Sequence, residues 1–346
     1  MKLAHLESLR SLAVVGATGL VGRELFSILA EHRIRIPQVR ALASERSIGE
    51  EVEYGDQVIP VEALTAESFH GMQAAIFSAP NEISREYIPI AADAGCAVVD
   101  DSSVFRMYPE VPLIVPEVNG ETLRDFVGQV MATPNCSTTP LVMVLKPLLE
   151  HYGIERVVVS TYQSVSGAGR AAYQELSEQT IALLSGKASD MKVFPHRISF
   201  NCLPLIGKPI ESGDSDEEAK ILNESRKILG AANLRISATA VRVPTFGGHG
   251  LSVNIELSDP FENVESVREL LDTTPGVRVL DKPESNIYPT NVECVGGDDV
   301  LVGRIRRDTS VESGVNLWVI GDNLRKGAAS NALQILDTYL YYKRMN

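Results

Sequence analysis

The chain has 346 residues, of which 44% are hydrophobic and 22% charged, a composition usual for folded globular proteins. This length is about twice that of a typical domain, so we expect two domains, each with its own core. The 45 acidic and 32 basic residues give a net charge of −13, which argues against nucleic acid or an anionic membrane as a partner.

The cysteines and the apolar segments narrow the class of protein further. Cys96, Cys136, Cys202 and Cys294 are widely spaced and form no CxxC pair, so neither a zinc site nor a disulfide framework is predicted. No segment of the sequence reaches the ~18 uninterrupted apolar residues that a membrane span requires. We therefore expect a cytoplasmic protein that needs no metal.

In the first part of the chain, short apolar runs alternate with segments of helical pattern. The apolar runs are "SLAVVG", "VRALAS", "QAAIFSAP", "CAVVDDSS" and "GQVMATPN", and the helical segments among them are "VGRELFSILAEH" and "SREYIPIAADAG". This alternation is typical of βαβ units. It predicts an α/β fold with a doubly wound, Rossmann-like parallel sheet in the N-terminal part.

After Cys136 an apolar helix is predicted over 138–151, and the pattern then changes to period-two alternation. Runs such as "LRISATAVRVP", "GLSVNIELSD" and "GVNLWVIGD" predict a mostly antiparallel sheet and hence an α+β domain. Helices are expected near 169–185, at 263–273 and in the amphipathic tail. "VECVGGDDVLVG" predicts a hairpin with Gly296, Gly297 and Asp298 at its turn.

The change of pattern is also the basis for the predicted domain boundary. We expect one domain over 1–136, completed by a C-terminal helix at 326–346, and a second domain over 137–325.

A glycine-rich loop follows the first predicted strand in "AVVGATGLVGRELFSILA". Gly16, Gly19 and Gly22 stand three residues apart, directly before an amphipathic helix. Glycines here permit a tight turn and a close approach of the backbone to a pyrophosphate at the helix N-terminus. The loop therefore predicts a dinucleotide site, although a tight turn without a ligand would have the same pattern. Its contact residues are expected to be Gly16, Thr18, Gly19, Leu20 and Val21.

The end of the second predicted strand, "ALASERSIGE", bears on the choice of nucleotide. A carboxylate there suits the ribose hydroxyl of NAD, whereas a basic residue with hydroxyls suits the extra phosphate of NADP. Ser44, Arg46 and Ser47 favour NADP, although Glu45 lies among them. An ordinary solvated loop is the alternative.

Cys136 lies in "TPNCSTTP", directly before the predicted apolar helix. A cysteine attacks as its thiolate, which a helix N-terminus or a nearby cation stabilises. Ser137, Thr138 and Thr139 can cap the first turn, and Pro140 is well tolerated there. A lone cysteine is more often a packed residue, but beside a nucleotide domain its thiolate could form an intermediate that exchanges hydride with nicotinamide. The other three cysteines occur in strand-like or apolar runs and are interpreted as structural.

Among the six histidines, His249 in "VRVPTFGGHG" is the candidate acid or base, because it follows two glycines and lies seven residues after Arg242. The remaining histidines occur in polar contexts and are expected to be structural or exposed; they are His5, His32, His70, His151 and His196.

From about residue 11 onward, the chain resembles aspartate-semialdehyde dehydrogenases in eight motifs that keep their order and approximate spacing. These are "GATGLVGRE", "SSVFRM", "VPEVN", "TPNCSTTP", "TYQSVSGAGR", "EEAK", "VRVP" with the later histidine, and "DNLRKGAA". The resemblance implies NADPH-dependent conversion of L-aspartyl-4-phosphate to L-aspartate-4-semialdehyde. It implies a homodimer and a place in the biosynthesis of lysine through diaminopimelate, and of threonine and methionine.

The resemblance also implies the roles of individual residues. Cys136 would be the acylated nucleophile, Gln163 would orient the reacting group and His249 would be the general acid/base. The thiolate would displace phosphate, and hydride would then reduce the thioester. Backbone N–H groups at the start of the following helix could stabilise the oxyanion.

The implied substrate contacts give each charged group of aspartyl phosphate a partner. Arg242 would bind the carboxylate with its planar fork, and Glu217 would receive the amino group. Arg106, Asn135 and Lys220 would bind the phosphate, which is also the inorganic product. On the cofactor side, the implied residues are Ser166, Gly167, Gly169 and Asn323.

Two other functions are compatible with much of this pattern. N-acetyl-glutamyl-phosphate reductase shares the loop and the cysteine, but its cysteine is usually followed by tyrosine and proline, whereas Ser137 and Thr138 follow Cys136 here. A catalytically silent, nucleotide-binding paralogue is the second alternative. It predicts a Cys136 thiol of ordinary reactivity.

Overall fold

The computed structural model describes residues 3–345 and divides into two compact units. One contains the described residues up to Asn135 together with those from Ala328 onward, and the other is Cys136–Gly327. Each unit is described by itself. No helix among the described residues is long and apolar enough to span a membrane.

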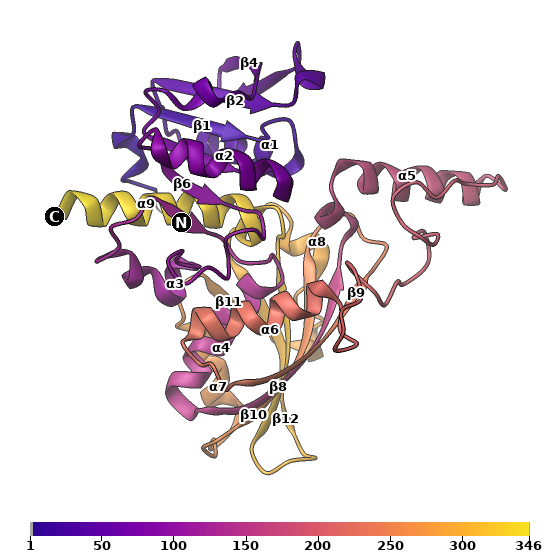
Figure 1. Cartoon of the computed structure of the whole chain (residues 1–346). Coiled ribbons are helices and arrows are strands. Elements are labelled where there is room, and N and C mark those ends of the chain that lie inside the picture. Colours follow the sequence, from indigo (N-terminus) through magenta and orange to yellow (C-terminus); the bar gives the residue numbers. More distant parts are fainter. Residues whose placement is uncertain (1–2, 346) are drawn as a thin grey trace. The chain divides into compact units, whose positions relative to one another are not determined.

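The first unit is built on a seven-stranded sheet in the order β3-β4-β2-β1-β5-β6-β7, parallel throughout except for the β3–β4 hairpin (Figure 1). The strands are β1 (Ser11–Val15), β2 (Gln38–Ala43), β3 (Glu51–Tyr54), β4 (Gln57–Ala63), β5 (Ala74–Phe77), β6 (Ala97–Asp100) and β7 (Val130–Ala132). The strand order reverses between β1 and β5, which is where open α/β sheets place their ligands.

Both faces of this sheet are covered by helices. Leu12 and Val14 of β1 face a core shared with α1 (Leu20–Glu31) and α9 (Ser330–Met345). Ala13 and Val15 face the opposite core, which α2 (Asn81–Asp93) closes. Short helical segments complete the unit: η1 (Leu6–Ser8), η2 (Glu45–Ser47), η3 (Ala66–Phe69), α3 (Pro116–Asn119) and η4 (Gly120–Leu123). The two-sided core explains why these strands are apolar along their whole length.

The second unit is built on a six-stranded mixed sheet in the order β11-β12-β13-β10-β8-β9, with parallel pairs only at β8–β9 and β11–β12. Its strands are β8 (Ile154–Gln163), β9 (Arg235–Arg242), β10 (His249–Leu257), β11 (Val277–Val279), β12 (Val300–Asp308) and β13 (Gly314–Gly321). Helices α4 (Thr138–Tyr152), α6 (Asp216–Leu229) and α7 (Val264–Asp272) pack together along the sheet (Figure 1). Helix α5 (Arg170–Leu184) follows η5 (Val165–Ala168).

The fold confirms the predicted α/β class and the predicted helices at 138–151, 169–185 and 263–273, within one residue at each end. The predicted hairpin in "VECVGGDDVLVG" is wrong. Its first half is the short helix α8 (Asn291–Cys294), because Thr290 and Glu293 form a reciprocal capping box, and β12 begins only at Val300. The turn glycine does lie between them, since Gly296 has a φ of 82°. Two further short segments are η6 (Pro283–Ser285) and the π-helical η7 (Arg325–Ala329).

Candidate active site

The glycine loop of the first unit lies at the point where the strand order reverses. Gly16 has a φ of 85°, and a Cβ built on it would lie 2.0 Å from the carbonyl oxygen of Ser78, which follows β5. A Cβ on Gly22 would lie 2.3 Å from the oxygen of Gly16, so the first turn of α1 packs directly on the loop. Gly19 is the N-cap of α1 and brings no side chain to it. The loop thus offers backbone N–H groups at a helix N-terminus, as a pyrophosphate requires.

The other predicted nucleotide contacts surround this loop. The Thr18 and Ser47 hydroxyl oxygens lie 3.4 Å apart, so the loop and the segment after β2 meet. Ser44 and Arg46 are exposed beside them. Leu20 and Val21 are half-buried in the first turn of α1. These residues fit a phosphorylated nucleotide, because an exposed cation and two hydroxyls lie at the end of the second strand.

Two of the three predicted phosphate ligands belong to the first unit. Arg106 is buried, and its guanidinium donates to the carbonyl oxygen of Asp101 at 2.8 Å. Asn135 is buried at the end of the unit, directly before Cys136. Lys220, the third, belongs to the second unit.

Cys136 is half-buried and comes two residues before α4. Ser137 is the N-cap, but its side chain forms no capping hydrogen bond, so the predicted hydroxyl cap is not found at this residue. Gly327 lies against the cysteine, and a Cβ built on it would be 3.0 Å from the Cβ of Cys136. The sulfur therefore stands at the start of a 15-residue helix, where the helix dipole favours a thiolate.

Three predicted site residues form one row across the central strands of the second sheet. Gln163 of β8 pairs with His249 of β10 on one side and with Arg242 of β9 on the other. Because neighbouring residues in one row point to the same face, all three buried side chains project together. The row lies at the end of β8 and β9, and at the start of β10, which runs in the opposite direction.

Helix α6 adds two charged residues to this row. The Gln163 amide nitrogen donates to Glu217 at 3.2 Å, and Lys220, one turn along the helix, pairs with the same carboxylate at 3.3 Å. The helix begins at a capping box in which Ser215 and Glu218 satisfy each other's backbone N–H groups. The second oxygen of Glu218 accepts the N–H of Ala240, which fixes the first turn of α6 against β9.

The His249 ring is held by Ser164, which was not predicted. The backbone N–H of Ser164 donates to Nδ1 of His249 at 3.2 Å, and the Ser164 hydroxyl lies 3.1 Å from the same nitrogen. The carbonyl oxygen of Ser164 accepts from Arg242 at 2.8 Å. Ser164 thus orients both His249 and Arg242. In the sequence, the only sign of this role is that Ser164 directly follows Gln163.

The predicted cofactor residues of the second unit surround this histidine. The Asn323 amide oxygen accepts from the hydroxyls of Ser164 and Ser166 at 3.1 and 3.2 Å, and from the Gly248 N–H at 3.1 Å. A Cβ built on Gly167 would lie 3.0 Å from Nε2 of His249. Gly169, with a φ of 87°, is instead the N-cap of α5 and faces open space.

Burial decides the charges in this cluster. It lowers the pKa of His249 to about 3, with the positive charge of Arg242 acting in the same direction and Glu217 opposing it. Burial also lowers the pKa of Arg242, while the charges of Glu217 and Cys136 raise it. Near neutral pH the site therefore contains a neutral imidazole beside a guanidinium that is electrostatically coupled to the cysteine.

The remaining cysteines and histidines lie outside this cluster. Burial raises the pKa of Cys96 to about 11 and that of Cys294 to about 12, as expected for structural thiols. Cys202 does not lie in a strand or an apolar core, as its sequence context suggested. It is exposed in an irregular segment. The five histidines other than His249 are exposed or half-buried, as predicted.

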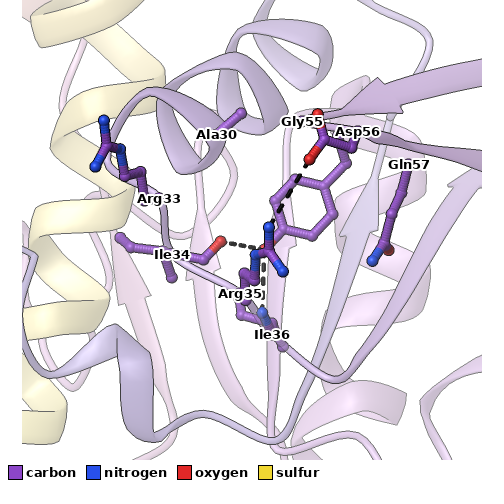
Figure 2. A pocket seen from close by; sticks show the side chains of 9 residues that line it. Ala30, Arg33, Ile34, Arg35, Ile36, Gly55, Asp56 and Gln57 are labelled. Carbon is purple, nitrogen blue, oxygen red and sulfur yellow. Dashed lines mark hydrogen bonds and ion pairs between the residues drawn. The ribbon is translucent and has the colours of Figure 1, made fainter.

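A separate hollow lies in the first unit at the end of α1 that is remote from the glycine loop. Figure 2 shows Arg33 and Arg35 on one side of it, and Asp56 and Gln57 on the hairpin that closes the other side. None of the predicted site residues lines it.

Comparisons with known proteins identify the family to which the chain is similar. A family model described as "Semialdehyde dehydrogenase, NAD binding domain" matches residues 11–126, and one described as "Semialdehyde dehydrogenase, dimerisation domain" matches residues 145–326. The chain is 46% identical over 328 residues to the aspartate-semialdehyde dehydrogenase of Aquifex aeolicus, covering 94% of this chain and 96% of the relative.

Solved structures give the same result. Aspartate semialdehyde dehydrogenase II from Vibrio cholerae, in a crystal structure described as complexed with ASA, superposes with a TM-score of 0.91 at 40% identity. The match covers 95% of this chain and 98% of the other. The Candida albicans enzyme, solved with NADP, superposes with a TM-score of 0.76 at 25% identity, covering 98% of this chain and 100% of the other.

Proposed function

Because the chain belongs to the aspartate-semialdehyde dehydrogenase family, we propose that it reduces L-aspartyl-4-phosphate to L-aspartate-4-semialdehyde and phosphate through a thioester on Cys136. The observation that carries this proposal is the row of Arg242, Gln163 and His249 in the same unit as a cysteine at a helix N-terminus. A silent paralogue would have no need of that arrangement, and residues Ser137 and Thr138 argue against N-acetyl-glutamyl-phosphate reductase.

In this proposal each residue of the row acts on one part of the substrate. The Cys136 thiolate attacks the acyl carbon and expels phosphate, Gln163 orients the reacting group, and His249 is the general acid/base. Arg242 binds the carboxylate in bidentate fashion. Glu217, which already accepts from Gln163 and Lys220, receives the substrate ammonium group. Phosphate is assigned to Arg106, Asn135 and Lys220.

We assign NADP binding to the first unit. The glycine loop and Thr18 would hold the pyrophosphate, and Ser44, Arg46 and Ser47 suit the additional phosphate. When bound, NADPH supplies the hydride that reduces the thioester. The structure from Candida albicans, which is described as solved with NADP, supports this choice of nucleotide.

We further propose a homodimer that works in the cytoplasm in the synthesis of lysine, threonine and methionine. The second unit matches a dimerisation-domain model. The other face of the same sheet, away from the His249 side chain, is exposed at three neighbouring strands. Its exposed residues Tyr162, Thr239 and Ser252 offer a surface to a second copy of the chain. A reducing compartment suits a nucleophilic thiol.

The test is the reverse reaction with aspartate semialdehyde, phosphate and NADP, followed by the absorbance of the reduced nicotinamide. We expect phosphate-dependent activity that is lost in Cys136→Ala and retained in Cys202→Ala, the matched control at an exposed cysteine. NAD in place of NADP should give a lower kcat/KM. A folded protein that binds NADP without turnover would support the silent paralogue instead, and turnover only with N-acetyl-glutamate semialdehyde would support the reductase.

A further inference from the structure

Glu218 binds two backbone groups that belong to different elements. One oxygen of its buried carboxylate accepts the N–H of Ser215 at 2.6 Å and closes the capping box of α6. The other oxygen accepts the N–H of Ala240 in β9 at 2.9 Å. A capping box needs only the first of these contacts. The second contact joins the start of the helix to the sheet.

The contact with Ala240 lies on the outer edge of the sheet. β9 is an edge strand, and its alternate N–H groups point outward. The outward N–H of Arg242 donates to the carbonyl oxygen of Leu203 at 2.9 Å, and the Leu203 N–H donates in return at the same distance. Glu218 accepts the outward N–H two residues earlier, a place that a further strand would otherwise fill. The helix is thus attached to β9 directly beside Arg242.

The neighbours of Glu218 on α6 are the two charged residues that face the row. Successive helical residues are roughly 100° apart, so Glu218 can hold β9 while Glu217 faces Gln163. Lys220 lies on the same side of the helix as Glu217 and pairs with it at 3.3 Å. The three residues belong to one turn. The attachment of that turn to β9 therefore sets the position of both charges relative to Gln163 and Arg242.

Small displacements of this turn would disturb the site. The Glu217 oxygen lies 3.2 Å from the Gln163 amide nitrogen, at the long end of the range for such a bond. Movement by about 1.5 Å, the rise of one helical residue, would break it. An error of about 1 Å in the position of a binding group can cost a large part of the rate. The capping box alone does not prevent such movement, because Ser215 and Glu218 belong to the same helix and move with it.

We propose that Glu218 is a positioning residue: it fixes Glu217 and Lys220 where they bind the ammonium and phosphate groups of the substrate. The inference rests on the proposed function for the identity of those groups. Glu218 itself turns both oxygens to backbone N–H groups and does not touch the substrate. Its effect therefore appears in substrate binding, and only through its two neighbours.

The test compares Glu218→Ala with Ser215→Ala by steady-state kinetics of the reverse reaction. Each variant removes one half of the capping box, but only the first removes the contact with β9. A hydrogen bond to a charged group changes affinity by about tenfold or more, so Glu218→Ala should raise KM for aspartate semialdehyde and for phosphate by that factor. KM for NADP, which binds the first unit, should stay within about twofold.

Ser215→Ala should lower the midpoint of thermal unfolding and leave both substrate KM values within about twofold of the wild type. Equal KM changes in the two variants would show that the cap matters and not the link to β9, and would overturn the proposal. Glu218→Gln keeps the length of the side chain but only one acceptor oxygen. It replaces the alanine variant if that variant does not fold, with the same expected direction.

A double variant tests whether Glu218 acts through Glu217. Once the Glu217 carboxylate has been replaced, its position no longer matters to the ammonium group. In the Glu217→Gln background, Glu218→Ala should therefore raise KM for the semialdehyde by about twofold at most. Fully additive increases would show that Glu218 acts independently of its neighbour and would overturn the positioning role.

Hydrogen exchange gives a readout that does not depend on activity. In Glu218→Ala, exchange at Ala240 and in the first turn of α6 should become faster, whereas in Ser215→Ala exchange at Ala240 should stay as in the wild type. Unchanged exchange at Ala240 in Glu218→Ala would contradict the attachment. If the wild type itself has no activity with the semialdehyde, the proposed function fails, whereas the exchange result still decides whether Glu218 holds the helix to the sheet.

Discussion

Gly167 is important because of the side chain that it lacks. Its position in η5 has an ordinary negative φ, so alanine could adopt the same backbone conformation. The added Cβ would nevertheless lie 3.0 Å from His249 Nε2 and 3.1 Å from Arg242 Nη1. The restriction at this residue is therefore one of space in the site and not of backbone geometry.

Gly167→Ala is expected to lower kcat/KM by about 10²-fold with little loss of stability, because its methyl group would press on the His249 ring and the Arg242 guanidinium and displace both from their present positions. Steady-state kinetics and thermal unfolding check this together. Gly120→Ala is the matched control, since its Cβ would meet only ordinary contacts at 3.6 Å. A fully active Gly167→Ala enzyme would show that His249 and Arg242 tolerate the added methyl group.

His249 should also make stability depend on pH. The unfolded histidine takes up a proton below its ordinary pKa of 6.5, whereas the folded ring stays neutral down to about 3. Its contribution is thus fully present above pH 6.5 and is lost as the pH falls towards 3. Between pH 7 and pH 5 the wild type should lose about 2 kcal/mol more than His249→Gln. Urea unfolding at the two pH values measures the difference, and parallel losses would contradict a buried neutral ring.

Among the elements, α5 shows how a helix can hold an irregular segment. Its buried Glu175 accepts the N–H groups of Lys192 and Val193 at 2.9 and 2.5 Å. One turn further, Gln179 accepts those of Ile198 and Ser199 at 3.0 and 3.1 Å. The segment after the helix is therefore fixed by contacts with α5 and contains no strand, with the Thr180 and Ser199 hydroxyl oxygens also 3.0 Å apart (Figure 1).

Gln179→Ala should loosen this segment locally, because it leaves two backbone N–H groups without their acceptor at a cost of about 1–3 kcal/mol. Hydrogen exchange at Ile198 and Ser199 should become faster, while exchange in β10 stays unchanged. Glu178→Ala, an exposed neighbour on the same helix, is the control. Unchanged exchange at both amides would show that other contacts hold the segment.

The helices and strands also show which parts of the secondary structure could be predicted from the sequence. The hydrophobic pattern was sufficient to predict the helices α4, α5 and α7, because their apolar positions recur at helical spacing. It was also sufficient to predict the strands β1 and β5, because both of their faces are buried. It failed at α8, where the capping pair of Thr290 and Glu293 outweighs an apparent alternation. It also omitted the β3–β4 hairpin, although Gly55 and Asp56 form a two-residue turn between the strands.

The same limit applies to the site. Gln163, Arg242 and His249 were predicted through family motifs, but their alignment in one row follows from strand pairing, which no local pattern specifies. The contacts of Ser164 depend on that pairing as well. The contact between Ser164 and His249 could not be predicted from the sequence, since the two residues are 85 positions apart.

At the scale of the whole molecule, the first unit is made from both ends of the chain. Residues of α9, among them Leu333 and Leu336, are fully buried in the core that covers one face of the parallel sheet. His5 and Leu6 further attach the N-terminal segment to this helix, because their N–H groups donate to Asp337 at 2.7 and 3.0 Å. The stability of the nucleotide-loop unit therefore depends on the last residues of the chain.

Leu333→Ala should weaken the first unit selectively, by about 2–5 kcal/mol, since it opens a cavity in this core. Hydrogen exchange in β1 and α1 should become faster. The fluorescence of Trp318, the only tryptophan, reports the second unit and should keep its denaturation midpoint. Arg344→Ala, exposed on the same helix, is the control. Equal shifts of both signals would mean that the units unfold together.

The discontinuous first unit has a consequence for synthesis on the ribosome. Translation proceeds from the N-terminus, and domains tend to fold as they are completed. The second unit ends at Gly327 and so is complete before α9 has been made. The unit that begins first thus finishes last, and until then the apolar face beneath α9 is uncovered. In the nascent chain, this surface is the one that a chaperone would have the longest time to bind.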